Sequence, residues 1–200
     1  MEENQICQLP SNALSETKSS LRLLDLSHNC FAAIPAQQLR NSLKLTFLDL
    51  SGNKIAEIGT FNLMNLPQLK ELRLNDNVLN NISHMGFMNV PELQLLYLKN
   101  NLIGNLDGNR LQAFKKLEVL DVRNNMLNKL PSFKDLPNLK HIFLDNNLIA
   151  RVDTLAFTAN PKLEMISLQN NEISLVARNS FDSLDNLQYL MLANNSIKSI

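Results

Sequence analysis

The residue types that most often perform catalysis are few in this chain of 200 residues. None of its three histidines, His28, His84 and His141, pairs with a serine or cysteine in a form that suggests an activated nucleophile. The sequence has no phosphate-binding glycine loop, no paired histidines of a zinc protease and no C-x-x-C pairs of a zinc site. We therefore expect no catalytic residue, no cofactor and no metal.

Two asparagines stand in N-glycosylation sequons, Asn81 in Asn-Ile-Ser and Asn194 in Asn-Asn-Ser. The chain contains 29 asparagines. With so many, about three sequons would arise by chance alone. The sequence by itself therefore gives little support to either asparagine as a modification site.

Charge and hydropathy exclude two kinds of partner. The 19 Lys and Arg balance the 19 Asp and Glu, and nucleic-acid binding through counterion release needs a basic excess. No apolar run approaches the ~20 residues of a membrane-spanning helix, so we expect no membrane insertion by this segment.

Residues 1–10 also lack the basic start and apolar stretch of a secretory signal.

An internal repeat is visible in the spacing of the asparagines. Eight of them follow one another in steps of 24 residues, with a single step of 22. Each closes the pattern L-x-x-L-x-L-x-x-N, in which Val122, Ile142 and Ile166 are the only substitutions for leucine. One copy consists of Leu69, Leu72, Leu74 and Asn77. The eight asparagines are Asn29, Asn53, Asn77, Asn101, Asn125, Asn147, Asn171 and Asn195.

The pattern predicts one short strand in each repeat. The second and third leucines are two residues apart, so they point to one face of a strand while the residues between them point to the other. One repeat cannot bury its leucines alone, but parallel stacking of repeats buries them in a continuous core. Prolines recur in the segments between strands and interrupt long helices there.

With this repeat the chain resembles leucine-rich repeat proteins of the 24-residue class, found mostly in extracellular proteins such as Toll-type receptors. The resemblance implies an α/β-type repeat solenoid, a horseshoe with a parallel β-sheet on its concave face and irregular, 3₁₀ or short helical returns on its convex side. It makes residues 1–200 a single solenoid, with a partial repeat over 1–20, seven complete repeats over 21–186 and a partial repeat over 187–200. It also implies that the eight asparagine side chains bond backbone groups of their own and adjacent repeats.

Cys7 and Cys30 lie about one repeat apart, but their positions within the repeat differ by two. Cys7 comes three residues after Asn4, whereas Cys30 comes one residue after Asn29. This offset predicts a Cα separation beyond the ~7 Å limit for a disulfide, and hence two free cysteines. The chain also lacks the cysteine clusters that cap extracellular members of the family.

The outward positions of the strands hold the candidate binding residues. Phe143, Met165, Tyr189 and Met191 should cluster on adjacent strands, and side chains of these types are enriched at binding hot spots. The alternative is that such apolar columns are ordinary on these sheets, or that neighbouring repeats of a longer protein shield them. The candidate partner-binding set is Tyr97, His141, Phe143, Met165, Tyr189 and Met191, with Asp121 and Arg123 beside them.

The acidic residues of the same face allow two interpretations. We favour a solvated acidic strip formed by Asp25, Asp49 and Asp121. Alternatively, Arg73 and Arg123 pair with these acids, at about 0–1 kcal/mol for each pair.

These features predict a non-catalytic module that binds a protein ligand or receptor on its concave sheet, as part of a cell-surface or secreted receptor or adhesion protein. Two alternatives are an intracellular, cytoplasmic scaffold and the recognition arm of a larger catalytic or signalling polypeptide. Near Leu14 and Leu192 we expect uncapped ends that expose core residues and promote self-association.

Overall fold

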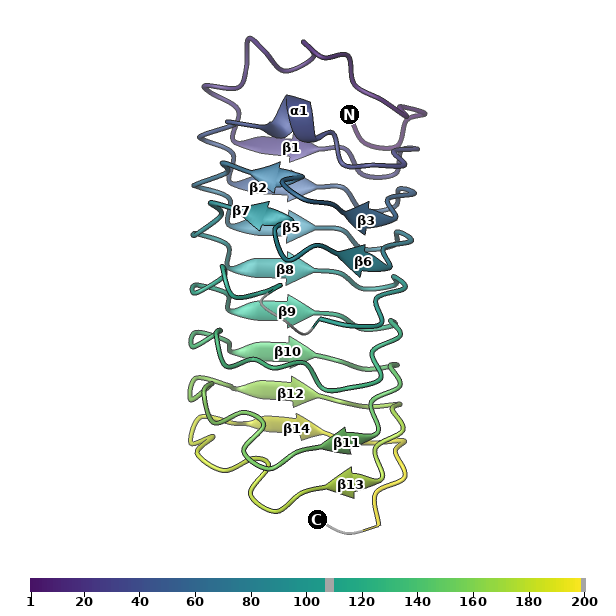
Figure 1. The fold of residues 1–200 in the computed structure, drawn as a ribbon, viewed down its shortest axis with the longest axis vertical. Coiled ribbons are helices and arrows are strands. Elements are labelled where there is room, and N and C mark those ends of the chain that lie inside the picture. The colour runs from purple at the N-terminus through teal and green to yellow at the C-terminus, as the bar shows by residue number, and fades with distance from the viewer. Residues whose placement is uncertain (107–109, 199–200) are drawn as a thin grey trace.

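Each repeat of the sequence forms one turn of a solenoid in the computed structural model, which describes residues 1–106 and 110–198 (Figure 1). One strand from each turn joins an eight-stranded parallel sheet in the order β1-β2-β5-β8-β9-β10-β12-β14. These strands are β1 (Leu23–Asp25), β2 (Phe47–Asp49), β5 (Glu71–Arg73), β8 (Leu95–Tyr97), β9 (Val119–Asp121), β10 (His141–Phe143), β12 (Met165–Ser167) and β14 (Tyr189–Met191). The parallel sheet that the repeat predicts is confirmed.

The pairing of the strands follows the repeat throughout the sheet. Leu24 lies opposite Leu48, one full step of 24 residues later. Leu120 lies opposite Ile142 although this step has only 22 residues. The return segment therefore absorbs the missing two residues, and the same side chains face inward on both sides of the short turn.

The segments between the sheet strands contain almost no helix. The described ranges hold a single α-helix, α1 (Ala36–Leu39), of four residues. Three two-stranded parallel ladders also form there: β3 (Glu57–Ile58) with β6 (Asn81–Ile82), β4 (Leu63–Met64) with β7 (Phe87–Met88), and β11 (Arg151–Val152) with β13 (Leu175–Val176). The predicted irregular returns are confirmed, with short strands and turns in place of most of the short helices.

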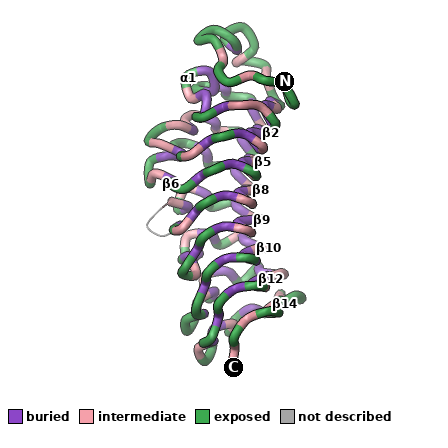
Figure 2. Tube along the Cα trace, turned by 90° about the vertical axis from the view of Figure 1, so that its right-hand side faces the viewer, coloured by how far each residue is buried: buried purple, intermediate pink, exposed green. Residues whose placement is uncertain are grey.

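One core runs the length of the molecule. Inward leucines such as Leu48 and Leu72 are fully buried, and buried segments recur from turn to turn in Figure 2. The rings of Phe133, Phe157 and Phe181 stack across successive returns, with centroids 5.9 and 5.8 Å apart. Because a fully buried Leu or Phe contributes about 1.5–3 kcal/mol, this shared core holds the turns together.

The N-terminal turn shows that the expectation of two free cysteines is wrong. A disulfide joins Cys7 and Cys30, whose Cα atoms are 4.4 Å apart. Directly after the repeated asparagines, adjacent turns are joined with a shift of one residue. Cys30, one residue after Asn29, donates its N–H to the carbonyl of Ile6, two residues after Asn4, at 3.1 Å. Lys54 N–H bonds Phe31 O in the same way at 2.9 Å. This stagger removes one of the two positions of the offset and brings Cys30 close to Cys7.

The N-terminal end also differs from the expectation of an exposed core. Leu14 is buried and joins the core, with Ile6 and Leu9 packed against it. The N-terminal segment lies beyond β1 at this end of the molecule (Figure 1). At the other end Leu192 is half-buried, and residues 199–200 lie outside the described residues.

Candidate functional site

The repeated asparagines form a ladder of hydrogen bonds beside the sheet. The Oδ1 atom of Asn53 accepts the backbone N–H of Phe31 in the preceding turn at 3.0 Å. Its Nδ2 atom lies 3.0 Å from both Leu26 O, in the preceding turn, and Leu50 O, in its own turn. The same set of bonds recurs at Asn77, Asn101, Asn125, Asn147, Asn171 and Asn195, and Asn29 bonds the N-terminal turn. Each asparagine thus gives a backbone N–H of the preceding turn an acceptor and donates to carbonyl groups of two turns.

A second column of residues, immediately before the ladder, escaped the sequence reasoning. All of its members have a positive φ, between 51° and 66°: His28, Gly52, Asp76, Asn100, Asn124, Asn146, Asn170 and Asn194. Asn, Asp and Gly tolerate this left-handed backbone better than other residues. Side chains of the column also bond one another, as Asn100 Nδ2 does to Asp76 Oδ1 at 2.6 Å. The signal in the sequence is the Asn-Asn pair that recurs in five repeats.

The strand register brings most of the candidate binding residues onto adjacent strands of one sheet face. His141, Met165 and Tyr189 lie side by side on β10, β12 and β14. Phe143 and Met191 lie two residues further along β10 and β14, on either side of Ser167. We call His141, Phe143, Met165, Tyr189 and Met191 the C-terminal patch. Tyr189 and Met191 are 52% and 37% exposed, and the other three are half-buried.

Asp121 is not part of a solvated acidic strip, and that interpretation is wrong. The side chain of Asp121 is only 5% exposed. Its carboxylate accepts hydrogen bonds from Nε of Arg123 at 2.9 Å and from a terminal nitrogen of Arg123 at 2.6 Å. The Arg123 guanidinium lies 5.0 Å from the centre of the Phe143 ring. The hydrogen bonds that Arg123 donates to the Asp121 carboxylate raise the pKa of Arg123. Asp121 therefore positions Arg123, whose side chain is the more exposed of the two.

The other two acids are held in the same local way. Asp49 is buried and accepts the backbone N–H of Ser51 at 2.8 Å, and Asp25 accepts the N–H of Ser27 at 2.9 Å. Aspartate commonly accepts the N–H two residues later where the chain turns, and here the chain turns at the ends of β1 and β2. The alternative interpretation was that arginines pair with the acids. It holds for Arg123 with Asp121 at 2.6 Å and, at a longer distance of 3.8 Å, for Arg73 with Asp49.

Tyr97 belongs to a separate cluster nearer the N-terminus. Arg73 lies between two rings, 5.1 Å from the Phe47 centroid and 5.7 Å from the Tyr97 centroid, and pairs with Glu71 at 2.6 Å. Burial, with the nearby Glu71 charge, raises the pKa of Tyr97. We call these four residues the Arg73 cluster. The sequence placed Tyr97 with the C-terminal patch, but the structure pairs it with Arg73.

Two other exposed apolar sets lie outside the eight-stranded sheet. One follows the ladder directly and comprises Val78, Leu102, Met126 and Leu148 on four successive turns. The other, in the returns of two adjacent turns, comprises Phe61, Met85 and Met88. The first was visible in the sequence as an apolar residue after each of four ladder asparagines.

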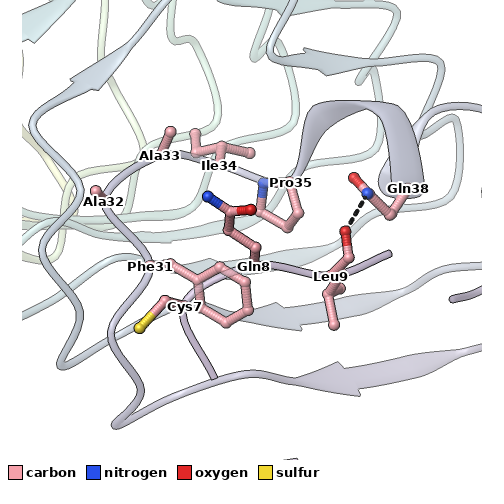
Figure 3. Close-up of a pocket in the computed structure, with 9 residues that line it drawn as sticks. All are labelled: Cys7, Gln8, Leu9, Phe31, Ala32, Ala33, Ile34, Pro35 and Gln38. Atoms are coloured by element: carbon pink, nitrogen blue, oxygen red, sulfur yellow. Dashed lines mark hydrogen bonds between the residues drawn. The ribbon is translucent and has the colours of Figure 1, made fainter. Parts of the chain in front are cut away.

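The N-terminal turn and the first return enclose a small hollow of about 270 Å³ (Figure 3). Gln8 projects into it, and Gln38 Nε2 donates to Leu9 O at 2.7 Å on its wall. No charged side chain lines it.

Within the described ranges, no group of three or more His, Cys, Asp or Glu is placed to hold a metal ion. No helix among those residues is long and apolar enough to cross a membrane.

Solved structures show what the chain is similar to. A chain of the Drosophila Toll–Spatzle complex matches with a TM-score of 0.90 and 25% identity, over 98% of this chain and 26% of that one. A chain of the octameric complex of Latrophilin 3, Unc5D and the leucine-rich repeat part of FLRT2 matches with a TM-score of 0.85 and 28% identity, over 98% and 60%. A chain of the TLR13 complex with single-stranded RNA matches at 0.80 and 23% identity, over 95% and 28%, and shows the fold alone.

Sequence comparisons give the family. No curated protein sequence matches this chain. The family model described as leucine rich repeat matches residues 44–103, 91–149 and 137–197. The fold agrees with this match, because each repeat adds one strand to a continuous parallel sheet. The chain belongs to the leucine-rich repeat family.

Proposed function

We propose that this chain is a protein-binding module that docks a protein ligand on the C-terminal patch of its concave sheet. The observation that carries the proposal is the strand register, which places Tyr189 and Met191 beside half-buried Phe143 and Met165 on one face of the sheet. Aromatic and methionine side chains are enriched at the centres of protein interfaces. Arg123, held by Asp121 over the Phe143 ring, adds a charge of fixed position at the rim. Such a charge contributes to the choice of partner.

A protein is the proposed ligand for two reasons. Two of the matched structures are complexes between proteins, Toll with Spatzle and FLRT2 with Unc5D and Latrophilin 3. The formal net charge of zero disfavours nucleic acid, because binding to phosphates needs a basic excess. The module acts by binding alone, without a catalytic step.

We also propose that the module works outside the cell or at its surface, within a longer receptor or adhesion protein. The Cys7–Cys30 disulfide supports this location, because disulfides persist in oxidising compartments and are rare in the cytosol. In this proposal residues 1–200 are one continuous solenoid, with seven complete repeats over 21–186 between partial repeats over 1–20 and 187–200.

Photo-crosslinking tests the docking face and identifies the ligand in the same experiment. A photoreactive amino acid is placed at position 189, on the C-terminal patch, or at position 182, an exposed site outside the eight-stranded sheet. The purified proteins are irradiated on intact cells and with secreted proteins, and crosslinked partners are identified by mass spectrometry. We expect a discrete protein that crosslinks at 189 and not at 182. Crosslinks at 182 alone, or at neither position, would contradict the proposal.

A further inference from the structure

The structure separates the two sequons, which the sequence alone could not rank. Asn81 lies in β6, is exposed, and its side-chain amide makes no hydrogen bond within the described residues. Its strand partner in the adjacent turn, Glu57, is also exposed. A sugar attached at Nδ2 of Asn81 would therefore extend into solvent without breaking a contact of the fold.

Asn194 is in a different situation. Its Nδ2 atom donates to Oδ1 of Asn170 at 2.7 Å, as part of the side-chain column before the ladder. Its backbone has a φ of +56°. The middle residue of its sequon, Asn195, is a ladder asparagine that donates to Leu168 O at 2.9 Å. A glycan at Nδ2 of Asn194 would interfere with the hydrogen bond from Asn194 to Asn170 and with the neighbouring bond from Asn195 to Leu168 O.

We propose that Asn81 carries an N-linked oligosaccharide and that Asn194 does not. The proposal rests on the proposed location and not on ligand binding. The Cys7–Cys30 disulfide supports it, because the oxidising secretory compartment that forms disulfides is also where N-linked sugars are attached.

The reaction uses a co-substrate and a transferase of that compartment. Asn81 Nδ2 attacks the anomeric carbon of an oligosaccharide carried on a lipid pyrophosphate. A carbon–nitrogen bond forms while the bond from that carbon to the pyrophosphate oxygen breaks. The lipid pyrophosphate leaves with the electron pair, and the amide loses one proton. Ser83 supplies the hydroxyl residue that the sequon requires.

A glycan at this position would leave the proposed docking face open. Asn81 belongs to the β3–β6 ladder, whereas the C-terminal patch lies on β10, β12 and β14 of the eight-stranded sheet. The two lie at different heights along the solenoid (Figure 1).

The test uses the 200-residue chain fused to a cleavable signal sequence and translated in the presence of eukaryotic microsomes. Only the protease-protected, disulfide-bonded pool is studied. Peptide-N-glycosidase in ¹⁸O water converts a glycosylated asparagine to labelled aspartate. Trypsin then yields residues 74–99, which contain Asn81, and residues 179–198, which contain Asn194. We expect label in the first peptide and none in the second.

Three variants serve as controls. Ser83→Ala destroys the sequon but keeps the Asn81 side chain, and Asn81→Gln removes the acceptor, so both should lose the glycan. Asn194→Gln should keep it. The proposal is overturned if protected, disulfide-bonded chains carry unmodified Asn81, or if Asn194 is labelled as strongly as Asn81. Neither outcome depends on whether the C-terminal patch binds a protein.

Discussion

Replacing Asn147 with alanine tests how much one member of the ladder contributes to stability. The Asn147 side chain is 5% exposed, and its Oδ1 atom accepts the backbone N–H of Leu127 at 2.9 Å. Its Nδ2 atom lies 3.0, 3.0 and 3.3 Å from the carbonyl oxygens of Val122, Leu144 and Asp145. Alanine removes all of these bonds at once.

The bonds are not equally costly to lose, because the ladder shares its acceptors. The three carbonyls keep other donors: Asn125 Nδ2 on Val122 at 3.1 Å, Asn171 Nδ2 on Leu144 at 3.0 Å, and the Asn124 N–H on Asp145 at 2.9 Å. Only the Leu127 N–H is left without its partner. One buried, unsatisfied donor costs about 1–3 kcal/mol, so we expect Asn147→Ala to lower the free energy of unfolding by about 2 kcal/mol.

Urea unfolding at neutral pH measures this loss. The matched control is Asn146→Gly, because Asn146 is exposed and its φ of +55° suits glycine. Alanine at position 146 is a poor control, since an ordinary residue in the left-handed region costs about 1–2 kcal/mol. We expect the glycine variant to stay within about 0.5 kcal/mol of the parent. If Asn147→Ala loses no more stability than Asn146→Gly, the ladder is not the stabilising feature that we describe.

Three further changes test other parts of the structure. Cys7→Ser should lower the free energy of unfolding by about 3 kcal/mol, because the disulfide joins residues 23 apart; a reducing agent should lower the melting temperature of the parent and leave that of the variant unchanged. Burial raises the pKa of Asp25, but hydrogen bonds from Ser27 outweigh it and hold that pKa below its ordinary value. The stability from Asp25 is therefore present above pH ~4 and lost as the pH falls; Ser27→Ala should raise the pKa of Asp25 in an NMR titration and weaken this acid dependence. Tyr189→Ala should change stability by less than about 0.5 kcal/mol in urea melts, and a larger loss would mean that Tyr189 packs into the core.

The period of the sequence was enough to predict the sheet, its register and the inward leucines. A side chain in a strand alternates faces, so the spacing of Leu72 and Leu74 determines which face is buried. Stacking at a constant step then determines which residues are neighbours, and this is why His141, Met165 and Tyr189 could be grouped from the sequence.

What the sequence could not predict depends on backbone geometry outside the strands. The Cys7–Cys30 disulfide requires the one-position stagger between turns at the corner after the ladder, and no residue type signals that stagger. The burial of Asp121 depends on where the N–H and side chain of Arg123 point after the strand ends. Side-chain reach decides the partners of Tyr97, because Arg73 is long enough to lie between rings on neighbouring strands.

The most direct test of the proposed function compares affinities for the identified protein ligand. Tyr189→Ala should weaken binding by about 30-fold, since truncating a hot-spot aromatic costs about 2 kcal/mol or more. Phe61→Ala is the matched control, because it removes an exposed aromatic ring outside the eight-stranded sheet. Titration calorimetry should show an unchanged affinity for Phe61→Ala and the 30-fold loss for Tyr189→Ala. Binding that survives Tyr189→Ala, or that is lost in Phe61→Ala instead, would contradict the assignment of the concave C-terminal patch as the docking face.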